Sequence, residues 1–197
     1  MAARGEHGVR RPKQCRALSR IAAMSIERFE LIPATPEFLR LLVAGQYHLA
    51  ERSLNLVVPE GWPNDPEAIA GLAWHLKALE SNGSELLWRM RLIVVNSTRT
   101  VIGSVNLKGS PDEGGAVEIG WGVSEQFRRR GIATRAAEEV MEWVFSQPGV
   151  KRIIATIPLD NTVSQRVAER LGMQQTQETR RELPVWEKKR ASKSENV

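Results

Sequence analysis

Hydrophobic and polar residues follow two different periods along this chain, and each period predicts a type of element. In Val117–Val123 bulky apolar residues alternate with Glu or Gly, which is typical of a strand with one packed face. In Ile132–Ser146 the apolar residues recur at helical spacing with three glutamates on the opposite face, and Pro148-Gly149 follows as a stop signal. The two segments are predicted to be a strand and the helix that follows it.

Similar signals predict the remaining elements. Proline after a capping residue marks helix starts at Thr35-Pro36 and Asp65-Pro66, and Asn82-Gly83 ends the second of these helices. The other predicted strands cover 29–33, 90–95, 100–107 and 153–157, with weaker ones near 174–177 and 185–188, and a last helix covers 161–171. We expect Ile69 and Val163 on the packed faces of two helices. A meander of strands followed by strand, helix, strand and helix indicates a mixed α/β sheet in one domain.

The composition is that of an ordinary globular protein. Of the 197 residues, 42% are hydrophobic and 26% are charged, and no run of 18 apolar residues exists that could span a membrane. The single cysteine, Cys15, cannot form an internal disulfide, and with three scattered histidines it makes no zinc cluster. We therefore expect a cytoplasmic protein that holds no metal and contacts no membrane.

The net charge of +5 belongs to the N-terminus and not to a basic binding face. Residues 1–23 contain six basic residues and one acid, which leaves 22 basic and 22 acidic residues from Met24 onward. A neutral globular part argues against nucleic acid as a partner. We expect 1–25 to be a basic disordered extension, 26–190 the folded domain and 191–197 a disordered tail. An organellar transit peptide and a working basic arm are the alternatives for the N-terminal segment.

The segment from Glu118 to Ala137 carries the most informative chemistry. A strand leads into Arg128-Arg129-Arg130-Gly131-Ile132-Ala133-Thr134, where the predicted helix begins. A loop of small and basic residues that enters a helix exposes several backbone N–H groups in one direction, and these groups form an anion site together with the helix dipole. A solvated basic turn before a surface helix is the alternative.

Two other phosphate-binding motifs are absent from the sequence. The Walker A motif requires a Gly-Lys pair, and none occurs. The dinucleotide fingerprint requires a third glycine where Glu125 follows Gly120-Trp121-Gly122.

Two stretches of the sequence resemble a known family. Arg128–Ala133 matches the Q/R-x-x-G-x-G/A signature of the GNAT superfamily of acetyl-CoA-dependent N-acetyltransferases, in which this loop grips the CoA pyrophosphate. Asp160–Met173 is similar to the N-x-x-[SA] element after that family's fifth strand, and its Asn-x-x-Ser form points to the branch with the ribosomal-protein N-terminal (alanine) acetyltransferases. The resemblance covers about residues 26–190.

The resemblance implies a fold, a co-substrate and a set of binding residues. The fold would be a single-domain GNAT fold, with a mixed, mostly antiparallel sheet of six to seven strands, flanking helices and a splayed central strand pair that holds the cofactor. The co-substrate would be acetyl-CoA, without a metal. The residues that the resemblance assigns to cofactor binding are Trp121, Gly122, Val123, Arg128, Arg129, Arg130, Gly131, Ile132, Ala133, Thr134, Asn161 and Ser164.

The candidate catalytic residues depart from the pattern of many family members. Ala168 stands where those members carry a tyrosine that protonates the CoA thiolate, so the resemblance makes Ser164 the donor candidate. Thr156 stands near the position of a glutamate base, which leaves Glu118 as the candidate base; an ion pair or a solvated strand position is its alternative. Asn161 is assigned to catalysis and to a cofactor contact, with a plain N-cap as the alternative.

The sequence gives fewer signals for the residues that would bind the acceptor amine. Trp62, Trp74 and Trp88 lie in the N-terminal half, where the family builds its acceptor pocket, and core packing is the alternative to ligand contact for each. No role is assigned to His48 or His75.

The leading hypothesis is an N-acetyltransferase, an acyltransferase that moves acetyl from acetyl-CoA to a primary amine by direct attack. The amine would belong to a protein N-terminus or to a small molecule, and a homodimer is left open. A catalytically weak CoA-binding or regulatory module of the same fold is the alternative, favoured by the missing tyrosine and glutamate. A nucleic-acid binder would rest on the basic tail alone.

Overall fold

The computed structural model of the chain describes residues 28–63 and 66–191, so the predicted N-terminal extension and all but residue 191 of the predicted C-terminal tail lie outside the described residues. A sheet with the strand order β1-β2-β3-β4-β5-β7-β6 runs through this part. Neighbouring strands are antiparallel except β4 and β5, which are parallel. The strands are β1 Phe29–Pro33, β2 Met90–Val95, β3 Thr100–Leu107, β4 Ala116–Val123, β5 Arg152–Thr156, β6 Gln174–Arg180 and β7 Leu183–Lys189. The predicted single-domain, mostly antiparallel α/β sheet is confirmed.

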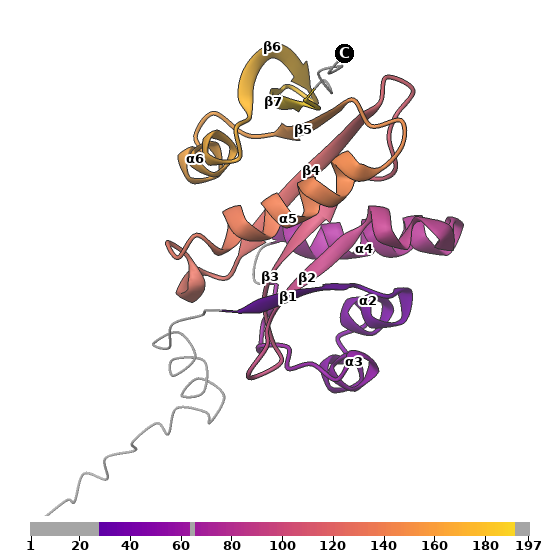
Figure 1. Cartoon of the computed structure of the whole chain (residues 1–197). Helices are drawn as coiled ribbons and strands as arrows, with labels where there is room; N and C mark the ends of the chain where they lie inside the picture. Colours follow the sequence, from indigo (N-terminus) through magenta and orange to yellow (C-terminus); the bar gives the residue numbers. More distant parts are fainter. Residues whose placement is uncertain (1–27, 64–65, 192–197) are drawn as a thin grey trace, which may run out of the picture.

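Helices cover both faces of this sheet (Figure 1). One face carries α2 (Pro36–Val43), α3 (Tyr47–Leu54) and α4 (Pro66–Ser81), and the other carries α5 (Ile132–Ser146) and α6 (Thr162–Arg170). Short 3₁₀ helices, η1 (Gly83–Trp88) and η2 (Glu125–Phe127), lie in two of the connections. Among the described residues, none of the helices combines the length and the apolar character needed to cross a membrane.

Strand β2 shows how the sequence builds a core on each face. All six of its residues are buried, and successive side chains point to opposite sides of a strand. Leu92 and Val94 accordingly belong to the core under α2, α3 and α4, whereas Ile93 and Val95 belong to the core under α5 and α6. The continuous apolar run of β2 therefore marks a strand that is covered on both faces.

Two apolar residues that were expected on packed faces are exposed instead. Ile69 on α4 is 51% exposed and Val163 on α6 is 64% exposed, whereas Leu72 and Leu79 of α4 are buried. Both exposed residues lie near the N-terminal ends of their helices, Ile69 in the first turn of α4 and Val163 in the first turn of α6. The expectation of a packed side chain was wrong at these two positions.

Two elements have no clear signal in the sequence. In α3 only Ala50 is buried, and in β6 no residue is buried. Because periodicity arises from burial of one face, such elements give a weak pattern at best, as in the strand predicted near 174–177. Strand β6 is an edge strand that pairs with β7 alone, and its polar residues suit an edge.

The sheet opens at its centre. Strand β4 pairs with β5 only over 116–118 and 152–154, although β4 continues to Val123. On its other side β4 stays against β3 up to the pair Gly103↔Val123. A Cβ atom on Gly103 would lie 2.2 Å from the backbone oxygen of Gly122, so the close approach of these two strands requires glycine there. The predicted splay of the central strand pair is confirmed.

Candidate active site

The opening between β4 and β5 presents unpaired backbone groups of β4. Within the sheet, the N–H of Lys108 donates to the carbonyl of Glu118 at 2.9 Å, and the N–H of Ser124 donates to the carbonyl of Ile102 at 2.8 Å. Even-numbered residues of this segment therefore direct their backbone groups toward β3, and odd-numbered residues direct theirs toward β5. Since β5 has separated from β4 by then, the N–H groups of Trp121 and Val123 point into the opening.

The loop after β4 ends in the predicted arrangement for an anion site. Gly131 is the N-cap of α5 with a φ of 70°, and Arg129 also has a positive φ of 63°. The next residues, Ile132, Ala133 and Thr134, form the first turn of α5, where N–H groups have no acceptor within the helix. Glycine has no side chain to cap them, so these donors point outward at the positive end of the helix dipole.

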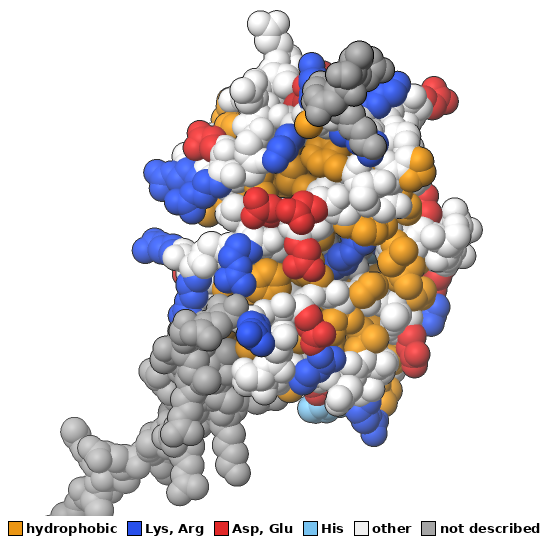
Figure 2. All heavy atoms as spheres, in the orientation of Figure 1, with side chains coloured by type: hydrophobic (Ala, Val, Ile, Leu, Met, Phe, Trp, Pro, Cys, Tyr) orange, Lys and Arg blue, Asp and Glu red, His pale blue; other side chains and the backbone are white. Residues whose placement is uncertain are grey.

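The three loop arginines differ in their local contacts. Arg128 donates from Nε to the carbonyl of Val123 at 3.0 Å, and Arg130 donates from Nη2 to the carbonyl of Gln126 at 3.4 Å. Figure 2 shows Lys and Arg side chains gathered along the edge where α6 and the loop before α5 lie, while charges of both signs mix over the rest of that face. The loop thus combines backbone donors with a local excess of positive charge.

A cleft of about 1110 Å³ lies on the α4 side of the opening. Five of the predicted site residues line it, namely Glu118, Trp121, Gly122, Asn161 and Ser164, whereas Val123 and Arg128–Thr134 do not. Gly120 and Gly122 of β4 form part of the cleft floor, and the space above them is open, because a Cβ atom on either glycine would meet nothing within 4 Å. The structure therefore brings the candidate catalytic residues together and leaves the anion loop at the far end of β4.

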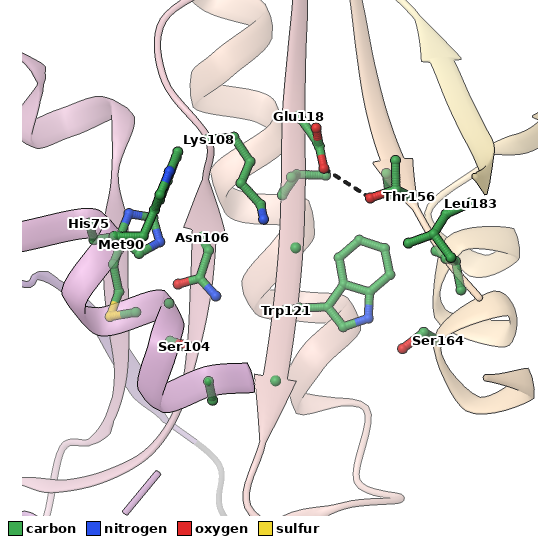
Figure 3. A pocket seen from close by; sticks show the side chains of 18 of the residues that line it. His75, Met90, Ser104, Asn106, Lys108, Glu118, Trp121, Thr156, Ser164 and Leu183 are labelled. Atoms are coloured by element: carbon green, nitrogen blue, oxygen red, sulfur yellow. Dashed lines mark hydrogen bonds between the residues drawn. The ribbon is translucent and has the colours of Figure 1, made fainter. Parts of the chain in front are cut away.

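Glu118 lies at the point where β4 and β5 part. Its side chain is 9% exposed, and its Oε1 accepts a hydrogen bond from Thr156 Oγ1 at 2.9 Å (Figure 3). Arg181, in the turn between β6 and β7, forms an ion pair with the same oxygen at 2.5 Å. The carboxylate from β4 thus reaches the threonine that stands near the expected position of a glutamate on β5.

Asn161 and Ser164 line the cleft from the start of α6. The Asn161 side chain accepts a hydrogen bond from the Ser164 backbone N–H at 3.0 Å, so Asn161 is the N-cap of α6. The cap fixes the first turn of α6, and the Ser164 hydroxyl lies in the cleft near the indole of Trp121 in the view of Figure 3. Asn161 therefore positions Ser164, which is the alternative role considered for it.

The structure adds cleft residues that the sequence did not single out. Asn106 comes from β3 and Lys108 directly follows that strand, His75 comes from α4, Arg180 ends β6 and Arg181 lies in the turn between β6 and β7. His75 is 3% exposed, and burial, then the cations Arg89 and Lys108, lower its pKa to about 4. Alternation along β3 could have indicated Asn106 and Lys108, since both share a face with Glu118 across the strand pair.

The tryptophans of the N-terminal half have different places. Trp62 is buried in the core under α4 and also lines the cleft, and Trp74 lines the cleft while 45% exposed. Trp88 instead packs on Trp143 with ring centroids 4.8 Å apart. Among the described residues, no group of three or more His, Cys, Asp or Glu side chains could hold a metal ion.

The chain is similar to known proteins over most of its described length. A family model described as an acetyltransferase (GNAT) domain matches residues 28–174. The chain is 30% identical over 127 residues to YjdG, an uncharacterized N-acetyltransferase of Bacillus subtilis, which covers 64% of this chain and 75% of that protein.

Two solved structures are similar in fold. One is RimL, a ribosomal L7/L12 α-N-protein acetyltransferase in complex with CoA, at 18% identity and a TM-score of 0.56 over 83% of this chain and 94% of that chain. The other is a ribosomal-protein-S5-alanine acetyltransferase from Vibrio fischeri, at 18% identity and a TM-score of 0.53 over 83% of this chain and 93% of that chain. At these identities the two structures establish the fold.

Proposed function

Because the chain belongs to the GNAT acetyltransferase family, we propose that it transfers the acetyl group of acetyl-CoA to an α-amino group at the opening between β4 and β5. The observation that carries the proposal is the open edge of β4. The N–H groups of Trp121 and Val123 face a gap that continues into the cleft with Glu118 and Ser164. A thioester placed along this edge would meet donors, a carboxylate and a hydroxyl at one place.

Acetyl-CoA would be held at both ends of β4. Its pyrophosphate would accept hydrogen bonds from the backbone of Arg129–Thr134, with the loop arginines screening its charge, and its pantetheine arm would follow Trp121–Val123. Charge-assisted hydrogen bonds contribute about 1.5–3 kcal/mol each. A few of them, together with burial of the rest of the ligand, suffice for roughly micromolar affinity. The CoA complex of RimL supports a CoA ester as the ligand of this fold.

The transfer itself would be a direct attack. The amine nitrogen forms a bond to the thioester carbon, and the carbon–sulfur bond breaks after a tetrahedral intermediate. The N–H groups of Trp121 and Val123 stabilise the oxyanion of that intermediate. Glu118 accepts the proton that the amine loses, directly or through water, and Ser164 donates a proton to the departing thiolate. Asn161 keeps the Ser164 hydroxyl in place through the cap of α6.

An α-amino group fits the proposal better than a lysine side chain. An α-amino group has a pKa of about 7.7–8.0, so roughly a quarter or more of it is neutral near pH 7.5, whereas a lysine of pKa about 10.4 is neutral to roughly 0.1%. The gap of about 2.5 pKa units corresponds to about 3.4 kcal/mol of additional free energy for deprotonating the lysine, which is more than a single weak base would easily supply. RimL, a ribosomal L7/L12 α-N-protein acetyltransferase, supports the same acceptor class.

Release of free CoA thiol tests the proposal. We expect thiol release from acetyl-CoA that depends on an added α-amine, with the acetylated product identified by mass spectrometry. The alternative is a CoA-binding module, favoured by Ala168 at the tyrosine position. If the protein bound CoA but no member of a panel of peptides and amino acids caused thiol release from acetyl-CoA, the result would contradict the proposed enzyme activity and support the CoA-binding module.

A further inference from the structure

We propose that the acceptor carries a carboxylate close to its amine and that Lys108 binds this carboxylate. The inference rests on the proposed function, because it concerns the second substrate of the same site. The observations that lead to it are a lysine without an ion-pair partner, an excess of positive charge in the cleft and unpartnered polar groups in the cleft wall.

Lys108 stands opposite a carboxylate and does not pair with it. Its backbone N–H bonds to the carbonyl of Glu118, so the two side chains share one face of adjacent strands, where opposite charges ordinarily interact. Glu118 turns instead to Thr156 and Arg181. Lys108 extends into the cleft between Asn106 and Glu118 in Figure 3 and has no ion-pair partner among the described residues. Its Nζ lies 5.6 Å from the centroid of the Trp74 ring, an aromatic contact that leaves the ammonium open to a ligand.

The other charged side chains that the structure describes in the cleft lining form ion pairs with one another. Arg181 pairs with Glu118, and Arg180 pairs with Asp112 at 3.3 Å. His75 is neutral near pH 7, because its pKa is lowered to about 4. Among the lining residues that the structure describes, the positive charge of Lys108 is therefore left without a matching negative charge. The loop proposed to hold the CoA pyrophosphate does not line the cleft, so the phosphates of CoA leave this charge unused.

Two other residues of the cleft lining carry buried polar atoms without a partner. The Oδ1 atom of Asn106 and the Nδ1 atom of His75 are buried and have no hydrogen-bond partner in the described part of the chain. An orphaned buried polar atom is costly unless a ligand or water satisfies it. Asn106 lies opposite Gly120, where a Cβ atom would meet nothing within 4 Å, so a ligand on that part of the cleft floor lies next to the Asn106 side chain, with its carboxylate toward the Lys108 ammonium.

This arrangement defines the class of acceptor by its chemistry. An amine with a nearby carboxylate can come from two sources. One is a peptide with an acidic residue next to its free N-terminus, and the other is a free amino acid. Both present an N–H donor beside a carboxylate. The two sources differ only in which carboxylate meets Lys108.

Equilibrium binding in the presence of free CoA tests the inference without requiring turnover. The peptide pair Ala-Asp and Ala-Asn, each with a free N-terminus, an amidated C-terminus and otherwise the same sequence, tests the peptide source. Alanine against alaninamide tests the amino-acid source. Calorimetric Kd values would be measured for the wild type, for Lys108→Met and for Lys77→Met, a control at an exposed position of α4 outside the cleft.

We expect the wild type and Lys77→Met to bind the acidic member of at least one pair about tenfold more tightly, as one charge-assisted hydrogen bond would give. The ratio should fall to about one in Lys108→Met and reverse in Lys108→Glu. Equal binding within both pairs, absence of binding by all four ligands, or a preference that survives in Lys108→Met would overturn the inference. A Lys108-dependent preference without acetyl transfer would leave it standing and would contradict the proposed function alone.

Discussion

Ser164 illustrates the account at the scale of one residue. Its hydroxyl lies in the cleft on the first turn of α6, and Asn161 fixes that turn. A donor that acts in proton transfer contributes at most about 10²–10⁴-fold to the rate. We expect Ser164→Ala to lower kcat within this range and to leave the affinity for acetyl-CoA almost unchanged, because the pyrophosphate contacts lie elsewhere.

Steady-state kinetics and calorimetry separate the two effects. Thr162→Ala, at an exposed position of the same helix outside the cleft, is the matched control and should keep the wild-type kcat. Normal turnover by Ser164→Ala would assign the proton donor to water or to another group.

Individual residues were predictable where a local signal existed. Asn161 precedes a helix and is spaced three residues before Ser164, and both features are visible in the sequence. Arg181 was not predictable, because its ion pair with Glu118 joins positions 63 residues apart through a turn of positive φ. His75 was passed over because a lone histidine on a helix has no pattern, and only the packing of α4 over the sheet buries it in the cleft wall.

At the scale of an element, the N-terminus of α5 is the proposed anchor of CoA. Gly131 and Gly149 both have positive φ values, 70° and 79°, and a Cβ atom on either would meet nothing within 4 Å. Valine at either position should destabilise the fold by about 1–2 kcal/mol, because β-branched residues avoid this conformation. Only Gly131→Val should also weaken CoA binding, by about tenfold or more, because its side chain would stand where a phosphate approaches the backbone.

Calorimetric titration of CoA into both folded variants compares the two effects. The Gly149→Val protein serves as the control for strain alone. An unchanged CoA affinity in folded Gly131→Val would remove the pyrophosphate from the N-terminus of α5.

Whole elements were predictable in proportion to their burial on one face. Helix α5 has an uninterrupted stripe of buried residues and was predicted with its observed bounds, Ile132–Ser146. The short helix α3 and the polar edge strand β6 bury almost nothing, so α3 was not predicted and β6 was predicted only in part, near 174–177. The splay of β4 and β5 was predicted from the family resemblance alone, because no local pattern in either strand indicates where the pairing between them ends.

At the scale of the whole molecule, buried His75 makes the folding stability depend on pH. Its pKa in the folded protein is about 4, below the ordinary 6.5. Between these values the unfolded chain binds a proton that the folded chain does not, so stability is full above pH 6.5 and falls as the pH drops toward 4. The shift of about 2.5 units corresponds to a loss of about 3 kcal/mol.

Urea unfolding between pH 7 and pH 4 measures this loss. We expect His75→Met to lack it, whereas His48→Gln, which replaces an exposed histidine, should follow the wild type. Hydrogen bonds to Asp112 and Glu178 lower the pKa of both carboxyl groups, so they add a further loss at still lower pH in all three proteins. If the free energy of unfolding changed with pH in the same way for wild type and His75→Met, the pKa of His75 would not be lowered in the folded protein, which would contradict the prediction.

The measurement that tests the central claim most directly compares two peptides of one sequence with acetyl-CoA and the purified chain. One peptide has a free α-amine and an acetylated lysine, and the other has a blocked α-amine and a free lysine. We predict that CoA thiol release is faster with the free α-amine by about 100-fold or more, because the neutral fraction of the two amines differs by about that factor near pH 7.5. Faster acetylation of the lysine-only peptide would contradict the account.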